Sequence, residues 1–95
     1  MHCHLLVQFK VKQDQVATFV AMLQESKSRI ASAPGCLGVE VLQSLDHKDK
    51  VALSEIWESR EHHDDYADKM RASGAMNQMA PFLAGPPEAE FFAIS

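Results

Sequence analysis

Glu55 and Trp57, which alternate along one predicted strand, are the first candidates for chemistry. They share a side with Val51 and Leu53, so this side of the strand is apolar and should face the core. A carboxylate there is costly unless it is hydrogen-bonded or reached by water. Glu55 therefore suggests a pocket acid or base whose pKa is raised by partial burial. The alternative is a structural carboxylate bonded to backbone or to a cation such as Arg60 or Arg71.

A second pair, His62 and Tyr66, lies one helical turn apart in the segment that follows. An imidazole and a phenol at this spacing can form one wall of a pocket. The histidine can take a phenolic proton from an aromatic substrate, and the tyrosine can orient that substrate or donate to an oxyanion. The alternative is a solvated His62 with Tyr66 at the edge of the core. His63 is turned from His62 by about 100° and is expected at the surface or rim.

The remaining histidines and the cysteines suggest neither a metal site nor a reactive thiol. His2 and His4 alternate onto one strand face at a metal-ligand spacing, but no third ligand is forced nearby. Cys3 and Cys36 form no recognisable disulfide or zinc pattern and have no evident cationic neighbour to lower a thiol pKa. We therefore expect no metal, and we interpret both cysteines as small apolar residues.

Four strands should position these side chains. Alternating apolar residues and polar turns predict them at 2–11, 37–45, 50–57 and 90–94. The middle two form a hairpin around the polar turn at 46–49.

Helices should separate the first two strands and the last two. Apolar residues at helical spacing predict a first helix that Asp14 caps and that ends at Pro34-Gly35. Ser59 is a good cap for a second helix beginning near Arg60, and a further short helix is expected over 76–83.

This order of elements predicts an α+β fold of the ferredoxin-like, split βαβ type, in which an antiparallel sheet has helices on one face. The other face carries a mixture of polar and apolar side chains, among them His2, His4, Leu6 and Ile56. Such a face suits contact with a second copy of the sheet. A small chain gains from this arrangement, because a partner covers apolar surface that water would otherwise touch.

Composition narrows the function classes. The chain of 95 residues is 46% hydrophobic and 23% charged, which is typical of one folded domain over 1–95 and not of disorder. The net charge of −4, without clusters of Lys or Arg, argues against nucleic acid and anionic membranes as partners. No stretch is long enough to span a bilayer, and the N-terminus lacks the pattern of a signal peptide. We expect a cytoplasmic protein.

Several segments in order along the chain resemble the antibiotic biosynthesis monooxygenase superfamily. They are Phe9-Lys10-Val11-Lys12, Ala33-Pro34-Gly35-Cys36-Leu37-Gly38, Val39-Glu40-Val41-Leu42-Gln43-Ser44, Leu53-Ser54-Glu55-Ile56-Trp57-Glu58-Ser59 and Leu83-Ala84-Gly85-Pro86-Pro87. The resemblance implies a dimeric α+β barrel, in which two sheets close on one another. It also implies a cofactor-free enzyme whose substrate lies between helices and sheet. On that basis we expect Trp57, Met70 and Phe9 to contact substrate, and Glu55, His62 and Tyr66 to act on it.

The resemblance favours a monooxygenase acting on a small phenolic or quinol-like molecule. A second hypothesis is isomerase-type processing of a small phosphorylated hydroxyketone, as in autoinducer-2 relatives, with Arg60, Lys69 or Arg71 holding the anion. A third is a non-catalytic dimeric protein that binds a small ligand. The third is motivated by a departure from the family: Tyr66 stands where many relatives carry a histidine.

Overall fold

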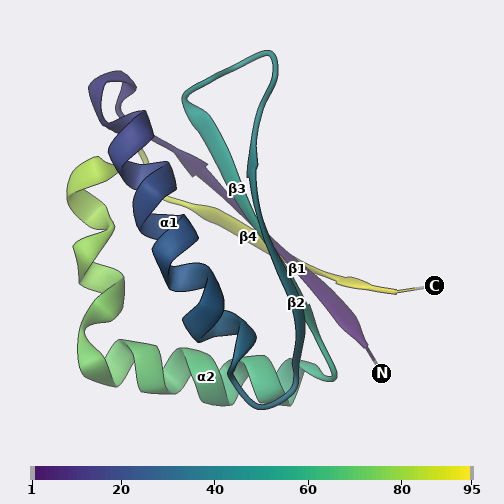
Figure 1. Cartoon of the computed structure of the whole chain (residues 1–95). Coiled ribbons are helices and arrows are strands. Elements are labelled where there is room, and N and C mark those ends of the chain that lie inside the picture. The colour runs from purple at the N-terminus through teal and green to yellow at the C-terminus, as the bar shows by residue number, and fades with distance from the viewer. Residues whose placement is uncertain (1, 95) are drawn as a thin grey trace.

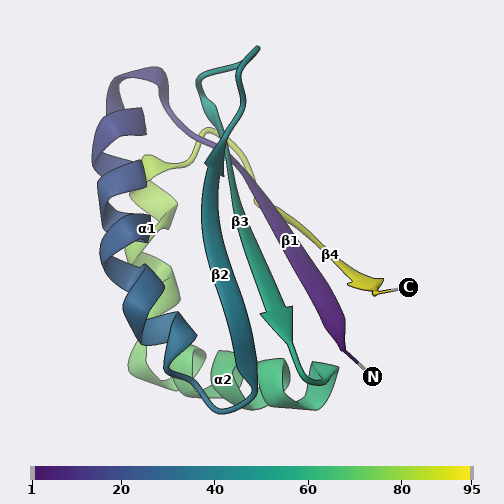
Figure 2. The same ribbon diagram turned by 45° about the vertical axis from the view of Figure 1, so that its right-hand side comes forward.

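The computed structural model describes residues 2–94, apart from the side chains of Ala75 and Met76. Four antiparallel strands form one sheet, in the order β2-β3-β1-β4. Their bounds are Cys3–Lys10 for β1, Cys36–Gln43 for β2, Lys50–Trp57 for β3 and Glu88–Ala93 for β4. Figure 2 shows the strands side by side, with β1 and β3 in the middle. The central strands therefore place their side chains between neighbours on both sides.

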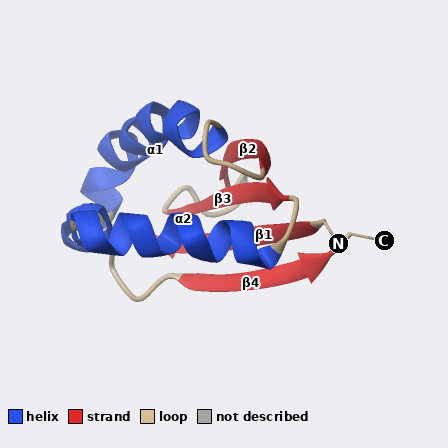
Figure 3. Cartoon of the chain, turned by 90° about the horizontal axis from the view of Figure 1, so that it is seen from below, coloured by secondary structure: helices blue, strands red, loops and turns tan. Residues whose placement is uncertain are grey.

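Two helices lie on the same side of this sheet, α1 over Val16–Ala31 and α2 over Arg60–Ser73 (Figure 1). The view from below shows α2 crossing one end of the sheet (Figure 3). Three short 3-10 turns complete the chain: η1 at Gln13–Gln15, η2 at Ala75–Gln78 and η3 at Ala80–Phe82. The helices and the last two turns enclose the space above one sheet face. The α+β ferredoxin-like arrangement predicted from the pattern is thus confirmed.

The predicted boundaries hold with some exceptions. Ser59 caps α2 as expected, because its Oγ accepts a hydrogen bond of 3.2 Å from the backbone N–H of His62. The prediction that Asp14 caps the first helix is wrong. Asp14 lies inside η1, and Gln15 stands at the cap position without a side-chain bond. A 3-10 turn ahead of the helix takes up the residues that the pattern assigned to the cap. The single short helix expected over 76–83 is instead the pair of turns η2 and η3.

The core lies between the helices and the sheet. Its fully buried side chains are Trp57, Phe19, Leu23, Val11 and Val51. Burial of these large apolar groups supplies most of the favourable free energy that holds the two layers together.

The opposite sheet face has no helix against it within the described part of the chain (Figure 1). The strand register puts His4, Ile56 and Phe92 in one row across this face. Phe92 is 44% exposed, and Leu42, on the same face, is 47% exposed. His4 Nε2 lies 2.5 Å from Ser54 Oγ, so a polar pair sits among apolar neighbours. None of the helices in the described residues is long and apolar enough to cross a membrane.

Candidate active site

Glu55 lies at the centre of the sheet, on the face that the helices cover. Its neighbours across the strands are Leu5 on β1 and Val39 on β2, and both are buried. Glu55 is itself only 5% exposed, and no other polar or charged residue in the described chain is so buried. Burial raises the pKa of its carboxyl, while a hydrogen bond from Trp57 and the nearby His63 act in the opposite direction. The protonated form therefore persists to higher pH than in an exposed glutamate.

One oxygen of this carboxyl is engaged and the other is open. The indole Nε1–H of Trp57 donates to Oε1 over 2.8 Å. The described residues donate no other hydrogen bond to this carboxyl. They also contain no fully buried side-chain oxygen that lacks a partner, so the second oxygen is not fully buried. The second oxygen is therefore accessible. Because Glu55 lines a cavity, that oxygen is available to a bound molecule.

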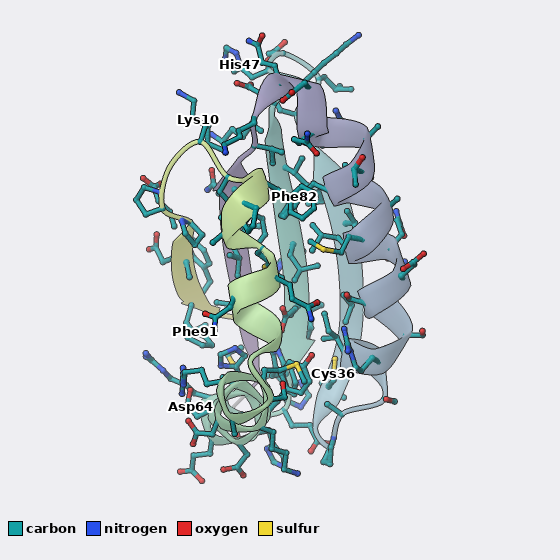
Figure 4. The ribbon with its side chains drawn as sticks, turned by 90° about the vertical axis from the view of Figure 1, so that its left-hand side faces the viewer. Lys10, Cys36, His47, Asp64, Phe82 and Phe91 are labelled. Carbon is teal, nitrogen blue, oxygen red and sulfur yellow. The ribbon has the colours of Figure 1, made fainter. Side chains whose placement is uncertain are left out.

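The cavity has a volume of about 430 Å³ and lies between the sheet, α1, α2 and the η2–η3 segment. This size is within the range of about 300–1,000 Å³ that is usual for small-molecule sites. Most of its wall is apolar, formed by side chains that include Leu5, Val7, Phe9, Leu53, Met70 and Leu83. Figure 4 looks at this helical side, with Phe82 of η3 beside α1. Phe91 of β4 lies near the start of α2, because Arg60 Cζ is 4.4 Å from the centroid of its ring. Such a wall suits a flat, largely apolar molecule with few polar substituents.

The structure places His62 outside this cavity. It is the third residue of α2, where it completes the cap: Ser59 Oγ lies 2.7 Å from its Nδ1 and accepts from its backbone N–H. Its Nε2 lies 3.7 Å from an oxygen of Glu58, and its side chain is 42% exposed. The predicted pocket wall of His62 and Tyr66 is therefore wrong, because capping turns the first helical turn so that His62 faces away.

His63 occupies the cavity wall instead. The sequence suggested the surface or the rim for this residue. Its side chain is 18% exposed and lines the cavity, so it is not a surface residue. The imidazole packs edge-on between two aromatic rings, with its centroid 5.5 Å from that of Trp57 and 5.0 Å from that of Phe91. This packing fixes the ring close enough to Glu55 for the two groups to interact electrostatically. His63 and Glu55 thus bring a base and an acid to one cavity.

Tyr66 lines the cavity as predicted, one turn beyond His63. Its ring centroid is 5.6 Å from that of Trp57. Burial raises the pKa of its phenol, Arg29 opposes this, and Glu55 and Cys36 add to it. A phenol with a raised pKa stays protonated and can donate a hydrogen bond to a developing oxyanion.

Of the three residues expected to contact substrate, two line the cavity and one lies behind it. Met70 and Phe9 are in the wall. Trp57 is fully buried and does not reach the cavity surface, so it acts on the site through Glu55, His63 and Tyr66.

Both thiols are free, and burial raises the pKa of the Cys36 thiol, which disfavours the reactive thiolate. The described residues contain no group of three or more His, Cys, Asp or Glu side chains placed to hold a metal ion.

Comparison with known proteins identifies the family. A sequence model described as antibiotic biosynthesis monooxygenase matches residues 3–76. The chain belongs to the antibiotic biosynthesis monooxygenase family. A comparison with curated proteins found no significant match.

Solved structures share the fold of this family member at low sequence identity. A protein from Nitrosomonas europaea, assigned to the antibiotic biosynthesis monooxygenases, has a TM-score of 0.88 and 18% identity over 97% of this chain and 88% of its own. A conserved protein from Methanosarcina mazei has a TM-score of 0.89 and 15% identity over 100% and 94%. SnoaB, a cofactor-independent oxygenase from Streptomyces nogalater, solved as an asparagine-to-alanine variant, has a TM-score of 0.83 and 13% identity over 98% and 92%. These likenesses show the shared fold.

A signal for His63 was present in the sequence of this family member. Ser59 and His62 are at the spacing of a capping box, in which the side chain of the third helical residue turns back to the cap at the start of the helix. The face containing Tyr66 and Met70 then includes His63 at i−3 from Tyr66. Proximity between His63 and Glu55 had no such signal, because it depends on how α2 crosses the sheet.

Proposed function

We propose that this protein is a cofactor-independent monooxygenase that acts on a small phenolic or quinol-like molecule. The observation that carries the proposal is the buried Glu55 carboxyl, with one free oxygen, on an apolar cavity that His63 and Tyr66 also line. An acid, a base and a phenol around an apolar space suit an aromatic substrate that must lose a proton and then gain oxygen. The fold shared with SnoaB, a cofactor-independent oxygenase, supports the same class of reaction.

The proposed reaction converts a 1,4-diol and O₂ into a 2-hydroxy-1,4-quinone and water. His63 accepts the proton of one ring hydroxyl, which leaves an electron-rich ring. The adjacent ring carbon bonds to O₂, and the electron pair of the ring reduces it to a peroxide. The negative charge moves from the ring oxygen, which becomes a ketone, to the outer oxygen of the peroxide. Tyr66 donates a hydrogen bond to the ring oxygen while it is charged.

Cleavage of the peroxide completes the balance. Neutral Glu55 protonates the peroxide, and its carboxylate then removes the hydrogen of the oxygenated carbon as the O–O bond breaks. The carbon becomes a carbonyl, and the departing hydroxide takes the proton held by His63 to leave as water. A proton then moves from the second ring hydroxyl to the new carbonyl oxygen, which converts the 4-hydroxy-1,2-quinone into the 2-hydroxy-1,4-quinone. Glu55 and His63 return to their starting protonation states. Burial raises the pKa of this carboxyl, so its protonated form is more available for this step than that of an exposed glutamate.

In this proposal the role expected of His62 passes to His63. His63 lines the cavity, whereas His62 contacts Ser59 and Glu58 outside it. Met70 and Phe9 contact the substrate as parts of the wall, and Trp57 positions Glu55 through the indole hydrogen bond.

Oxygen consumption tests the function directly. The protein, incubated with naphthalene-1,4-diol, should consume oxygen well above the uncatalysed rate. With ¹⁸O₂, mass spectrometry should find one labelled oxygen atom in the hydroxyquinone, the other having left in water. Uptake no faster than without protein, across a panel of quinols and phenols, would refute the proposal.

We also propose that the open sheet face pairs two copies of the chain. Exposed Phe92 and Leu42 belong to this face, where an apolar partner would shield them. Phe92→Asp should convert a dimer into a monomer in analytical ultracentrifugation. Ala17→Asp, on the exposed side of α1, is the control and should leave the dimer intact. A monomeric wild-type protein, or a dimer that survives Phe92→Asp, would contradict this pairing.

A further inference from the structure

Two arginines line the rim of the cavity at its exposed side. Arg29 lies in the last turn of α1 and Arg71 in the last turn of α2. Both side chains are exposed, although the surrounding wall is largely apolar. Helices that are far apart in the sequence thus bring two permanent cations to the wall of one cavity.

The contacts of these arginines leave donors available. Arg29 donates one hydrogen bond, from Nη2 to Ser26 Oγ over 3.2 Å. Arg71 pairs through Nη2 with the carboxylate of Asp68, which is 70% exposed. A guanidinium has five N–H donors, so each retains several that can meet a further oxygen atom. Arg29 also influences the phenol of Tyr66, which places its charge near the cavity side of α2.

The charge around the cavity is asymmetric. The Glu55 carboxyl beside His63 is the buried polar group of the wall, whereas the two arginines of the wall are exposed. The chain as a whole carries a formal charge of −4, so the positive charge of these two arginines is opposite in sign to the net charge of the protein. An anion held at the rim keeps part of its hydration and therefore avoids the large cost of burying a charge.

We propose that the substrate carries an acidic substituent, with carboxylate chemistry, which Arg29 and Arg71 bind at the rim while the reacting ring lies inside. This rests on the proposed function for the identity of the ring, and it goes further by naming a specificity determinant. Guanidinium groups bind carboxylates through paired hydrogen bonds, so they also fix the direction in which the ring enters. The ring hydroxyls then point toward His63 and Glu55.

Binding in the absence of oxygen tests this inference apart from turnover. The probes are naphthalene-1,4-diol and 1,4-dihydroxy-2-naphthoate, which differ only by the carboxylate, measured by anaerobic titration calorimetry. Wild-type protein should bind the carboxylate about tenfold more tightly, the effect expected of two solvent-screened ion pairs. The preference should shrink as salt is added. Arg29→Gln with Arg71→Gln should abolish this preference for the carboxylate over the neutral diol.

Matched controls and the possible outcomes make the result decisive. Lys27→Gln with Lys69→Gln removes the same charge from the same helices, away from the cavity wall, and should keep the preference. Equal binding of the two probes to wild-type protein, or a preference lost equally in both double variants, would overturn the inference. If the preference follows the arginines but neither probe supports oxygen uptake, the anion site stands and the proposed oxygenase activity fails. If the protein consumes oxygen but shows no preference for the carboxylate probe, the oxygenase activity stands and the anion site fails.

Discussion

Gly35 offers the sharpest test of how the start of α2 is held in place. Gly35 has a φ of +83°, a region that favours glycine, and it lies against the imidazole of His62. A Cβ added here would lie 2.4 Å from Cγ and Cδ2 of that ring and 2.6 Å from its Cβ. Gly74 has a similar φ of +76°, but a Cβ there would meet nothing within 4 Å. Gly35→Ala and Gly74→Ala therefore share the backbone cost and differ in the clash.

The expected free energies follow from these contacts. Placing alanine in the left-handed region costs about 1–2 kcal/mol, which should be the whole effect of Gly74→Ala. In Gly35→Ala the clash includes the Cβ of His62, so rotation of the side chain alone does not relieve it. The first turn of α2 must move, and loss of the Ser59 cap adds about 0.5–2 kcal/mol. Gly35→Ala should therefore lower the free energy of unfolding by about 1.5–4 kcal/mol.

Thermal and urea unfolding measure this difference. Trp57 is the single tryptophan and is fully buried, so its fluorescence reports loss of the site region itself. The additional cost of about 0.5–2 kcal/mol in Gly35→Ala should lower its Tm at least about 2 °C below that of Gly74→Ala. Oxygen uptake should also fall in Gly35→Ala, because His63 follows His62 on the displaced turn. Equal losses of stability in the two variants would refute the argument that Gly35 fixes the start of α2.

Two further substitutions address the acid and the base. Because burial raises the pKa of Glu55 above its ordinary 4.5 in the folded state, stability should fall as pH rises from about 4.5 through the folded-state pKa. Glu55→Gln keeps an acceptor for Trp57, so it should flatten the dependence of stability on pH in urea titrations. It should also lower kcat about 100-fold or more. An unchanged pH dependence of stability would contradict the burial argument. His63→Gln should lower oxygen uptake about 100-fold or more, whereas His62→Gln should lower stability with kcat retained. If His62→Gln lowered oxygen uptake and His63→Gln did not, His62 would be the base instead of His63.

The sequence alone determined the elements and the faces of the sheet. Alternation along 50–57 set Glu55 and Trp57 on the buried side, and Ser59 marked the start of α2 because capping depends on neighbouring backbone groups. These features arise from interactions within a few residues, so periodicity and residue type suffice to predict them. The same locality explains the error at Asp14, where a 3-10 turn and a helix cap have similar sequence preferences.

Only the tertiary structure decided which side chains share the cavity. A helical pattern gives the relative directions of His62, His63 and Tyr66, but it does not say which direction meets the sheet. The crossing of α2 over the sheet, together with the rings of Trp57 and Phe91, turns His63 inward. Arg29 reaches the same cavity from α1, a contact between distant segments that no local pattern encodes. The sequence thus placed Glu55 on the buried face of the sheet, and packing of the helices on the sheet selected its neighbours in the cavity.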